Sequence, residues 1–239
     1  DEVTVLGHFD IKEPVDTSES GLRAKVNEID QLVWPVIEKI VAAGKVPIIV
    51  GGGHNNVSPI LAGIYTAHHQ YVSAINIDAH ADIRSVAEGR HSGNGFSAAM
   101  EQGYLTHYKI FGLHASYNNE ETLATISASD LITATFFEDL LEVSPIMLQL
   151  WKDYLLDLNE PCALEIDLDS IQGVLASAAT PSGFTLNDVR RMVTFANKKF
   201  ASLHLCEGAV SMADGRTDAS TAKTIAYLIS DFIKAQNNL

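Results

Sequence analysis

The chain has 239 residues, of which 46% are hydrophobic and 19% charged, which is enough for one sizeable buried core. Its net charge of −14 argues against nucleic acid as a partner. No apolar run approaches the roughly 20 residues that a membrane-spanning helix needs, so we expect a cytoplasmic protein with no membrane partner.

Short apolar runs rich in β-branched residues alternate with longer segments that have helical spacing. The predicted strands are Val3–Leu6, Val46–Val50, Ser73–Ile77, Tyr108–Phe111, Leu131–Thr135, Cys162–Ile166 and Ser202–Cys206. The predicted helices are Leu22–Ala43, Leu140–Leu158, Asn187–Lys199 and Ser220–Ala235. This alternation predicts an α/β protein with three layers, α/β/α, around a mostly parallel central sheet.

Three of the predicted strands are each followed directly by residues that commonly bind metal ions. These segments are Gly51-Gly52-Gly53-His54, Asp78-Ala79-His80-Ala81-Asp82 and Asp167-Leu168-Asp169. In an open parallel sheet, ligands bind beyond the carboxyl ends of the strands, where all three segments lie. Extended chain places alternate residues on one side, so the side chains of each segment can converge.

The predicted ligands are His54, Asp78, His80, Asp82, Asp167 and Asp169. Carboxylates crowded in a partly buried site repel one another, and bound cations remove that repulsion. Oxygen ligands with some imidazole suit Mn²⁺ or Mg²⁺ better than a structural zinc ion. The ligands outnumber the share of one ion, and two metals about 3.5–4 Å apart would use all six. The glycines predict a tight turn rather than a phosphate loop, because no Gly-Lys-Ser/Thr follows them.

These motifs, followed by Glu207 in Leu205-Cys206-Glu207-Gly208, resemble in their order the ureohydrolase superfamily of arginases, agmatinases and formimidoylglutamases. The resemblance runs from about His54 to Glu207 and implies an arginase-like fold with two Mn²⁺ ions. The sequence shows no internal repeat or linker, so we expect one domain over residues 1–239. Compared with the superfamily the chain begins late, so either native N-terminal residues are missing, which we expect, or the protein is reduced. Members of the superfamily are often oligomers, so a homo-oligomer stays open.

The resemblance also implies a role for each ligand. One manganese would be held by His54, Asp78, Asp82 and Asp167, and the other by Asp78, His80, Asp167 and Asp169. Asp82 would orient the attacking water and pass its proton to the leaving amine. Glu207 would pair with the cationic end of the substrate.

The chain departs from the arginase pattern at several positions. Gly53 stands where arginases often have Asp, and Ser92 stands where arginases and agmatinases have a proton-shuttling His. His91, one residue earlier, is either the shuttle or a structural residue. The form Ser92-Gly93-Asn94-Gly95-Phe96 and Arg84, two residues after Asp82, are closer to formimidoylglutamases.

Arg84, Ser92, Asn94 and His114 are the candidate substrate-binding residues. Arg84 would either bind a substrate carboxylate or pair with a local acid. We therefore expect a manganese-dependent hydrolase of linear amidine C–N bonds, which converts formimidoylglutamate to glutamate and formamide. The alternatives are a guanidine hydrolase like agmatinase or arginase, and a metal-binding member that has lost catalysis. Cys162 and Cys206 are expected to be buried, reduced thiols.

Overall fold

A parallel sheet forms the middle of the molecule. The computed structural model describes residues 3–143 and 146–239, and this part of the chain forms six strands, β1 (Ile48–Val50), β2 (Val72–Ile77), β3 (Leu105–Leu113), β4 (Ile132–Phe136), β5 (Cys162–Asp167) and β6 (Ser202–Cys206). Their order across the sheet is β1-β6-β5-β2-β3-β4, and every pairing is parallel. All residues of β2, β5 and β6 are buried, as a parallel sheet covered on both faces requires.

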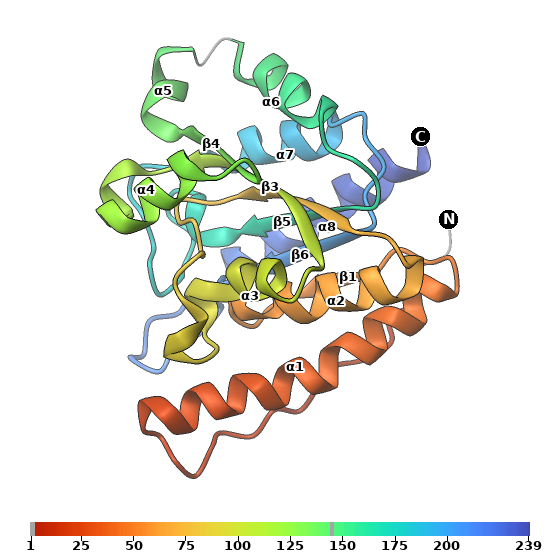
Figure 1. Cartoon of the computed structure of the whole chain (residues 1–239). Coiled ribbons are helices and arrows are strands. Elements are labelled where there is room, and N and C mark those ends of the chain that lie inside the picture. Colours follow the sequence, from red (N-terminus) through yellow and green to blue (C-terminus); the bar gives the residue numbers. More distant parts are fainter. Residues whose placement is uncertain (1–2, 144–145) are drawn as a thin grey trace.

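Helices cover both faces of the sheet (Figure 1). On one face lie α1 (Glu19–Ala42), α2 (Val57–His68), α3 (Gly95–Glu101) and α4 (Glu120–Ala128), which pack on Val72, Ala74 and Leu105. On the other lie α5 (Phe137–Glu142), α6 (Met147–Leu156), α7 (Leu186–Thr194) and α8 (Ser220–Asn237), which pack on Ile75, Leu164 and Leu203. The predicted three-layer α/β/α fold is therefore confirmed. No helix in the described part of the chain has the length and apolar character that crossing a membrane requires.

Two predicted helices differ from the observed ones. The predicted helix over 140–158 corresponds to two helices, α5 and α6, and positions 144–145 between them lie outside the described residues. The predicted helix over 187–199 ends earlier, at Thr194, and Asn197 adopts the left-handed backbone conformation, φ 53°, that a helix cannot continue through. At its start, Thr185 and Asp188 form a reciprocal capping box.

The predicted strand Val3–Leu6 is wrong. Its residues belong to no strand, and their side chains face solvent, with Val5 89% exposed. The alternation of apolar residues that favours a strand is present, but a strand also needs a neighbour whose backbone groups it can pair with. Among the described residues, the pairings of the sheet involve β1 to β6 alone.

Candidate metal centre

The six predicted ligands lie at the carboxyl ends of three strands, β1, β5 and β2, and Glu207 lies at the same end of β6, which stands between β1 and β5. His54 opens a short 3-10 helix, η1 (His54–Asn56), after β1, and Asp78 to Asp82 follow β2. Asp167 is the last residue of β5, and Glu207 directly follows β6. Four strands that are far apart in sequence thus bring these side chains close together.

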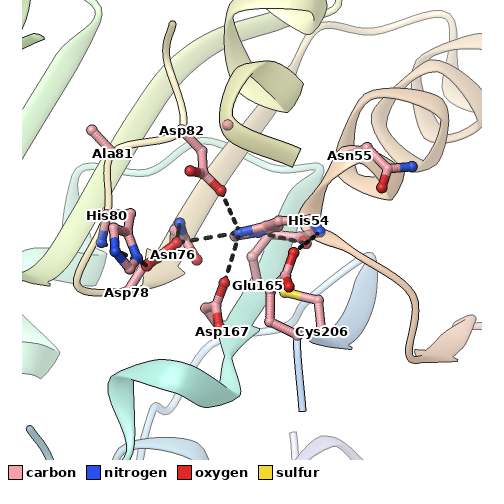
Figure 2. A network of polar contacts seen from close by, with 12 residues as sticks. His54, Asn55, Asn76, Asp78, His80, Ala81, Asp82, Glu165, Asp167 and Cys206 are labelled. Carbon is pink, nitrogen blue, oxygen red and sulfur yellow. Dashed lines mark hydrogen bonds and ion pairs between the residues drawn. The ribbon is translucent and has the colours of Figure 1, made fainter. Parts of the chain in front are cut away.

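The first ligand group surrounds Nδ1 of His54, and Figure 2 shows its carboxylates around the ring. This nitrogen lies 3.2 Å from Oδ2 of Asp78, 3.0 Å from Oδ2 of Asp82 and 3.3 Å from Oδ2 of Asp167. The His54 side chain is fully buried, yet neither of its ring nitrogens makes a hydrogen bond within the described part of the chain. Three carboxylates around one buried imidazole nitrogen form a set of donors suited to a cation.

The second ligand group shares Asp78 with the first. Nδ1 of His80 lies 3.5 Å from Oδ1 of Asp78 and 3.5 Å from Oδ2 of Asp169. The two oxygens of Asp78 therefore face different imidazoles. The sequence also predicts Asp167 as a shared ligand, but its Oδ2 faces His54 while its Oδ1 accepts a hydrogen bond from the Asp169 N–H at 2.9 Å.

The charges of this cluster conflict in the absence of a cation. Burial, reinforced by the charge of Asp78, raises the pKa of Asp82, Asp167 and Asp169 above the usual range. Burial alone would lower the pKa of His80, but hydrogen bonds to Asp169 and Asp78 outweigh it and raise this pKa to about 11. Protons thus hold the cluster together where divalent cations would do so, and the residues fit two such ions.

A buried network that sequence reasoning missed supports Asp78. Asn76 in β2 donates hydrogen bonds from Nδ2 to Oδ2 of Asp78 at 2.9 Å and to the Tyr108 hydroxyl at 3.0 Å. That hydroxyl in turn donates to the carbonyl of Ala81 at 2.9 Å. The spacing of Asn76 from Asp78 was a usable signal, because residues two apart in a strand share a face. Tyr108 gave no such signal, because it lies on a different strand.

Two predicted site residues adopt unusual backbone conformations. Asp82 and Glu207 have φ angles of 50° and 60°, in the left-handed region that non-glycine residues rarely occupy. Oε1 of Glu207 accepts a hydrogen bond from the His54 N–H at 2.8 Å. A Cβ atom on Gly53 would lie 3.1 Å from this oxygen and 2.9 Å from Oδ1 of Asn55. Glycine at position 53, where arginases often have Asp, therefore leaves room for the Glu207 carboxylate.

The candidate substrate-binding residues lie on segments around the centre, and their environments differ. Arg84 is exposed, its guanidinium rests against Gly93, and within the described residues it forms no ion pair. Ser92 is exposed and lies next to Gly53. Asn94 is buried and donates to the carbonyls of Ser85 and Gly89, so it braces its own loop.

The candidate proton shuttle, His91, and the last substrate-binding candidate, His114, both contact other side chains or backbone groups of the protein. Nδ1 of His91 accepts a hydrogen bond from the Gly93 N–H at 3.1 Å, and its Nε2 lies 3.5 Å from Glu88. His114 is buried between the rings of Tyr117 and Phe137, with centroid distances of 4.8 and 4.7 Å. The two cysteines are free and buried, as predicted.

Comparison with known proteins places this centre in a family. A model of the arginase family matches residues 3–233. The chain belongs to the arginase family. It is 28% identical over 206 residues to the formimidoylglutamase of Hahella chejuensis, a match that covers 80% of this chain and 62% of that protein. The chain thus spans less than two thirds of the length of this arginase-family relative.

Solved structures of other members share the fold. The formimidoylglutamase of Bacillus subtilis has a TM-score of 0.75 at 14% identity, over 95% of this chain and 70% of that one. The formiminoglutamase of Trypanosoma cruzi, solved with Mn²⁺, has a TM-score of 0.72 at 18% identity, over 92% of this chain and 73% of that one. At these identities the likeness shows the arginase-type fold.

Proposed function

We propose that this protein is a two-metal hydrolase of linear amidine C–N bonds and that its substrate is N-formimidoyl-L-glutamate. The observation that carries the proposal is the pair of ligand groups that share Asp78 at the carboxyl end of the sheet. Membership of the arginase family and similarity to formimidoylglutamases support the same reaction.

One cation would be held by His54, Asp78, Asp82 and Asp167, and the other by Asp78, His80 and Asp169, with Asp167 as a further shared ligand. The Mn²⁺ in the Trypanosoma cruzi relative supports manganese as the metal. Two such ions supply a Lewis acid that yields a nucleophile from water at neutral pH and polarises the amidine carbon.

The residues of the chain itself would orient the reactants and move the proton. Asp82 has one oxygen turned to Nδ1 of His54, which leaves the other free to orient the attacking water and carry its proton to the leaving amine. Oε1 of Glu207 accepts the hydrogen bond from the His54 N–H, so Oε2 can bind the cationic amidine of the substrate. Water adds to the amidine carbon, the bond to the glutamate nitrogen breaks, and glutamate and formamide leave.

Arg84 favours a substrate that carries carboxylates. Its backbone is fixed, because its N–H donates to the Gly93 carbonyl and its own carbonyl accepts from the Ser97 hydroxyl. Its exposed guanidinium has no acidic partner in the described part of the chain, which leaves its fork of donors available to a carboxylate. Agmatine has no carboxylate, and its cationic end would be repelled.

A panel of substrates tests the proposal. The chain is loaded with Mn²⁺ and incubated separately with formimidoylglutamate, agmatine and arginine, and the products are identified. We expect glutamate and formamide from the first and little urea from the others. Faster release of urea would instead indicate a guanidine hydrolase, and no product from a metal-loaded protein would indicate a member that has lost catalysis. Asp130→Asn, at an exposed position, should keep full activity, while Asp169→Asn should not.

Two further expectations accompany this function. We infer that the protein acts in the cytoplasm on a small molecule, and that it can form homo-oligomers. Localisation in cells and the mass of the protein in solution test these two inferences separately from the reaction.

A further inference from the structure

A carboxylate and an imidazole that are not among the proposed metal ligands lie buried beneath His54. Glu165 in β5 and His204 in β6 are direct neighbours across the two strands. Both side chains are completely buried, and Nδ1 of His204 lies 2.7 Å from Oε2 of Glu165. A buried carboxylate is costly unless it is paired and hydrogen-bonded, so its presence in a core strand requires partners.

The second partner of Glu165 is His54. The same oxygen, Oε2, lies 3.6 Å from Nε2 of His54, slightly beyond a hydrogen bond. Figure 2 shows Glu165 beside the His54 ring. This imidazole is thus placed between two kinds of neighbour, with three proposed ligand carboxylates around Nδ1 and Glu165 next to Nε2.

We propose that Glu165, held in place by His204, accepts the Nε2–H of His54 and so keeps its Nδ1 free to bind a cation. A neutral histidine carries one proton, on either ring nitrogen. The carboxylates around Nδ1 attract the proton to that nitrogen, where it would block a metal, and Glu165 favours the opposite tautomer. This is a positioning role, and it rests on the proposed two-metal function.

Removal of Glu165 should therefore lower the binding affinity for one of the two ions and leave the other unchanged. Metal-ligating histidines usually donate their other N–H to such a partner, and loss of the partner lowers metal affinity by about 10- to 100-fold. The ion held through His54 depends on Glu165, whereas the ion held through His80 does not contact it. A general disturbance of the fold would lower the binding affinity for both ions.

The test is calorimetric titration of the metal-free full chain with Mn²⁺. We expect two binding events in the wild type. In Glu165→Leu we expect one event unchanged and the other weaker by about 10- to 100-fold. Glu165→Gln, whose amide oxygen still accepts a hydrogen bond, should recover most of the loss. Cys162→Ala, which truncates another buried side chain of β5, should bind both ions as the wild type does.

The outcomes separate this inference from the proposed function. A wild type that binds no Mn²⁺ contradicts the two-metal function itself. A wild type with two sites and a Glu165→Leu variant that keeps both affinities, or loses both equally, overturns the role of Glu165. Circular dichroism of the metal-free variants checks folding. If Glu165→Leu does not fold, Glu165→Ser replaces it, with the same selective loss expected.

Discussion

Asp167 shows at the scale of single residues how closely the two ligand groups depend on each other. It faces Nδ1 of His54 with one oxygen and accepts the Asp169 N–H with the other, so it touches ligands of both groups. Asp167→Asn keeps the shape and that acceptor but removes the charge. We expect the variant to lose at least one Mn²⁺ and nearly all activity. Metal analysis by mass spectrometry measures the loss, and two full equivalents in this variant would contradict the assignment.

Arg84 gives a second prediction for a single residue. If its guanidinium binds a carboxylate of formimidoylglutamate, Arg84→Ala removes a charged hydrogen bond worth roughly 1.5–3 kcal/mol. We expect KM for that substrate to rise about 10- to 150-fold with little change in kcat. Steady-state kinetics measure the effect, with Arg216→Ala as an exposed control. Unchanged kinetics in Arg84→Ala would mean that the side chain only braces its loop.

The types and spacing of the ligands could be predicted from the sequence, but the groups that support those ligands could not. His54, Asp78 and Asp167 each follow a recognisable strand, so their convergence could be predicted from strand direction. Tyr108 meets Asn76 across 32 positions of sequence, and His204 meets Glu165 across 39. Such partners depend on which strands are neighbours, and the order β1-β6-β5-β2 is not readable from chain order.

At the scale of elements, His91 caps the N-terminus of the 3-10 helix η3 (Ser92–Asn94), and this contact predicts a structural role for it. The His91 ring accepts the Gly93 N–H and forms a capping box with Asn94. We expect His91→Ala to lower the free energy of unfolding by about 1 kcal/mol, as the loss of a cap does. The pH dependence of turnover should stay as in the wild type. A shifted pH profile would instead assign His91 the proton transfer for which the sequence makes it a candidate.

Arg90 joins three elements around the centre and gives another prediction. Its largely buried guanidinium donates to Asp30 of α1 at 3.0 Å, to Asn94 of η3 at 2.6 Å and to the carbonyl of Asn55 in η1 at 2.8 Å. Arg90→Ala leaves Asp30 largely buried and unpaired, which typically costs about 3–5 kcal/mol. Urea denaturation measures this, and Arg191→Ala, which breaks an exposed pair, should change stability by less than about 1 kcal/mol.

Whether a strand or helix could be predicted from the sequence depends on whether its own residues decide its conformation. The strands β2, β5 and β6 could be predicted because most of their residues are apolar, as burial on both faces of the sheet favours. The predicted strand Val3–Leu6 failed because strand formation also requires a partner, which the residues of the segment do not encode. The predicted helix ends were wrong where the backbone conformation of a single residue, such as Asn197, decides the boundary.

For the whole molecule, stability should depend on pH and metal together. The pKa of His80 is 6.5 unperturbed and about 11 in the folded metal-free protein, so its protonation stabilises the fold below pH 6.5 and this contribution declines as the pH rises toward 11. The raised pKa of Asp167 acts in the same direction as the pH rises. A divalent cation bound at the proposed centre would replace these protons, and its binding would tighten as they leave.

We therefore expect Tm in EDTA to fall between pH 6.5 and 8.5, and the increase in Tm on addition of Mn²⁺ to grow over the same range. At a concentration 100 times Kd, binding should add roughly 2.7 kcal/mol to the free energy of unfolding. Differential scanning calorimetry measures both trends. An increase in Tm that shrinks toward pH 8.5 would show that the cation does not replace protons of this cluster.

The place of β6 in the sheet determines when during synthesis the centre can first exist. This strand is the last one in the described chain, yet it lies between β1 and β5. Until a ribosome has released residues 202–206, β1 has no partner to hold it, and His54 cannot be fixed opposite Asp167. A nascent chain therefore cannot complete the proposed ligand group around His54 before residues 202–206 have left the ribosome, whereas Asp78, His80 and Asp169 follow β2 and β5, which pair directly.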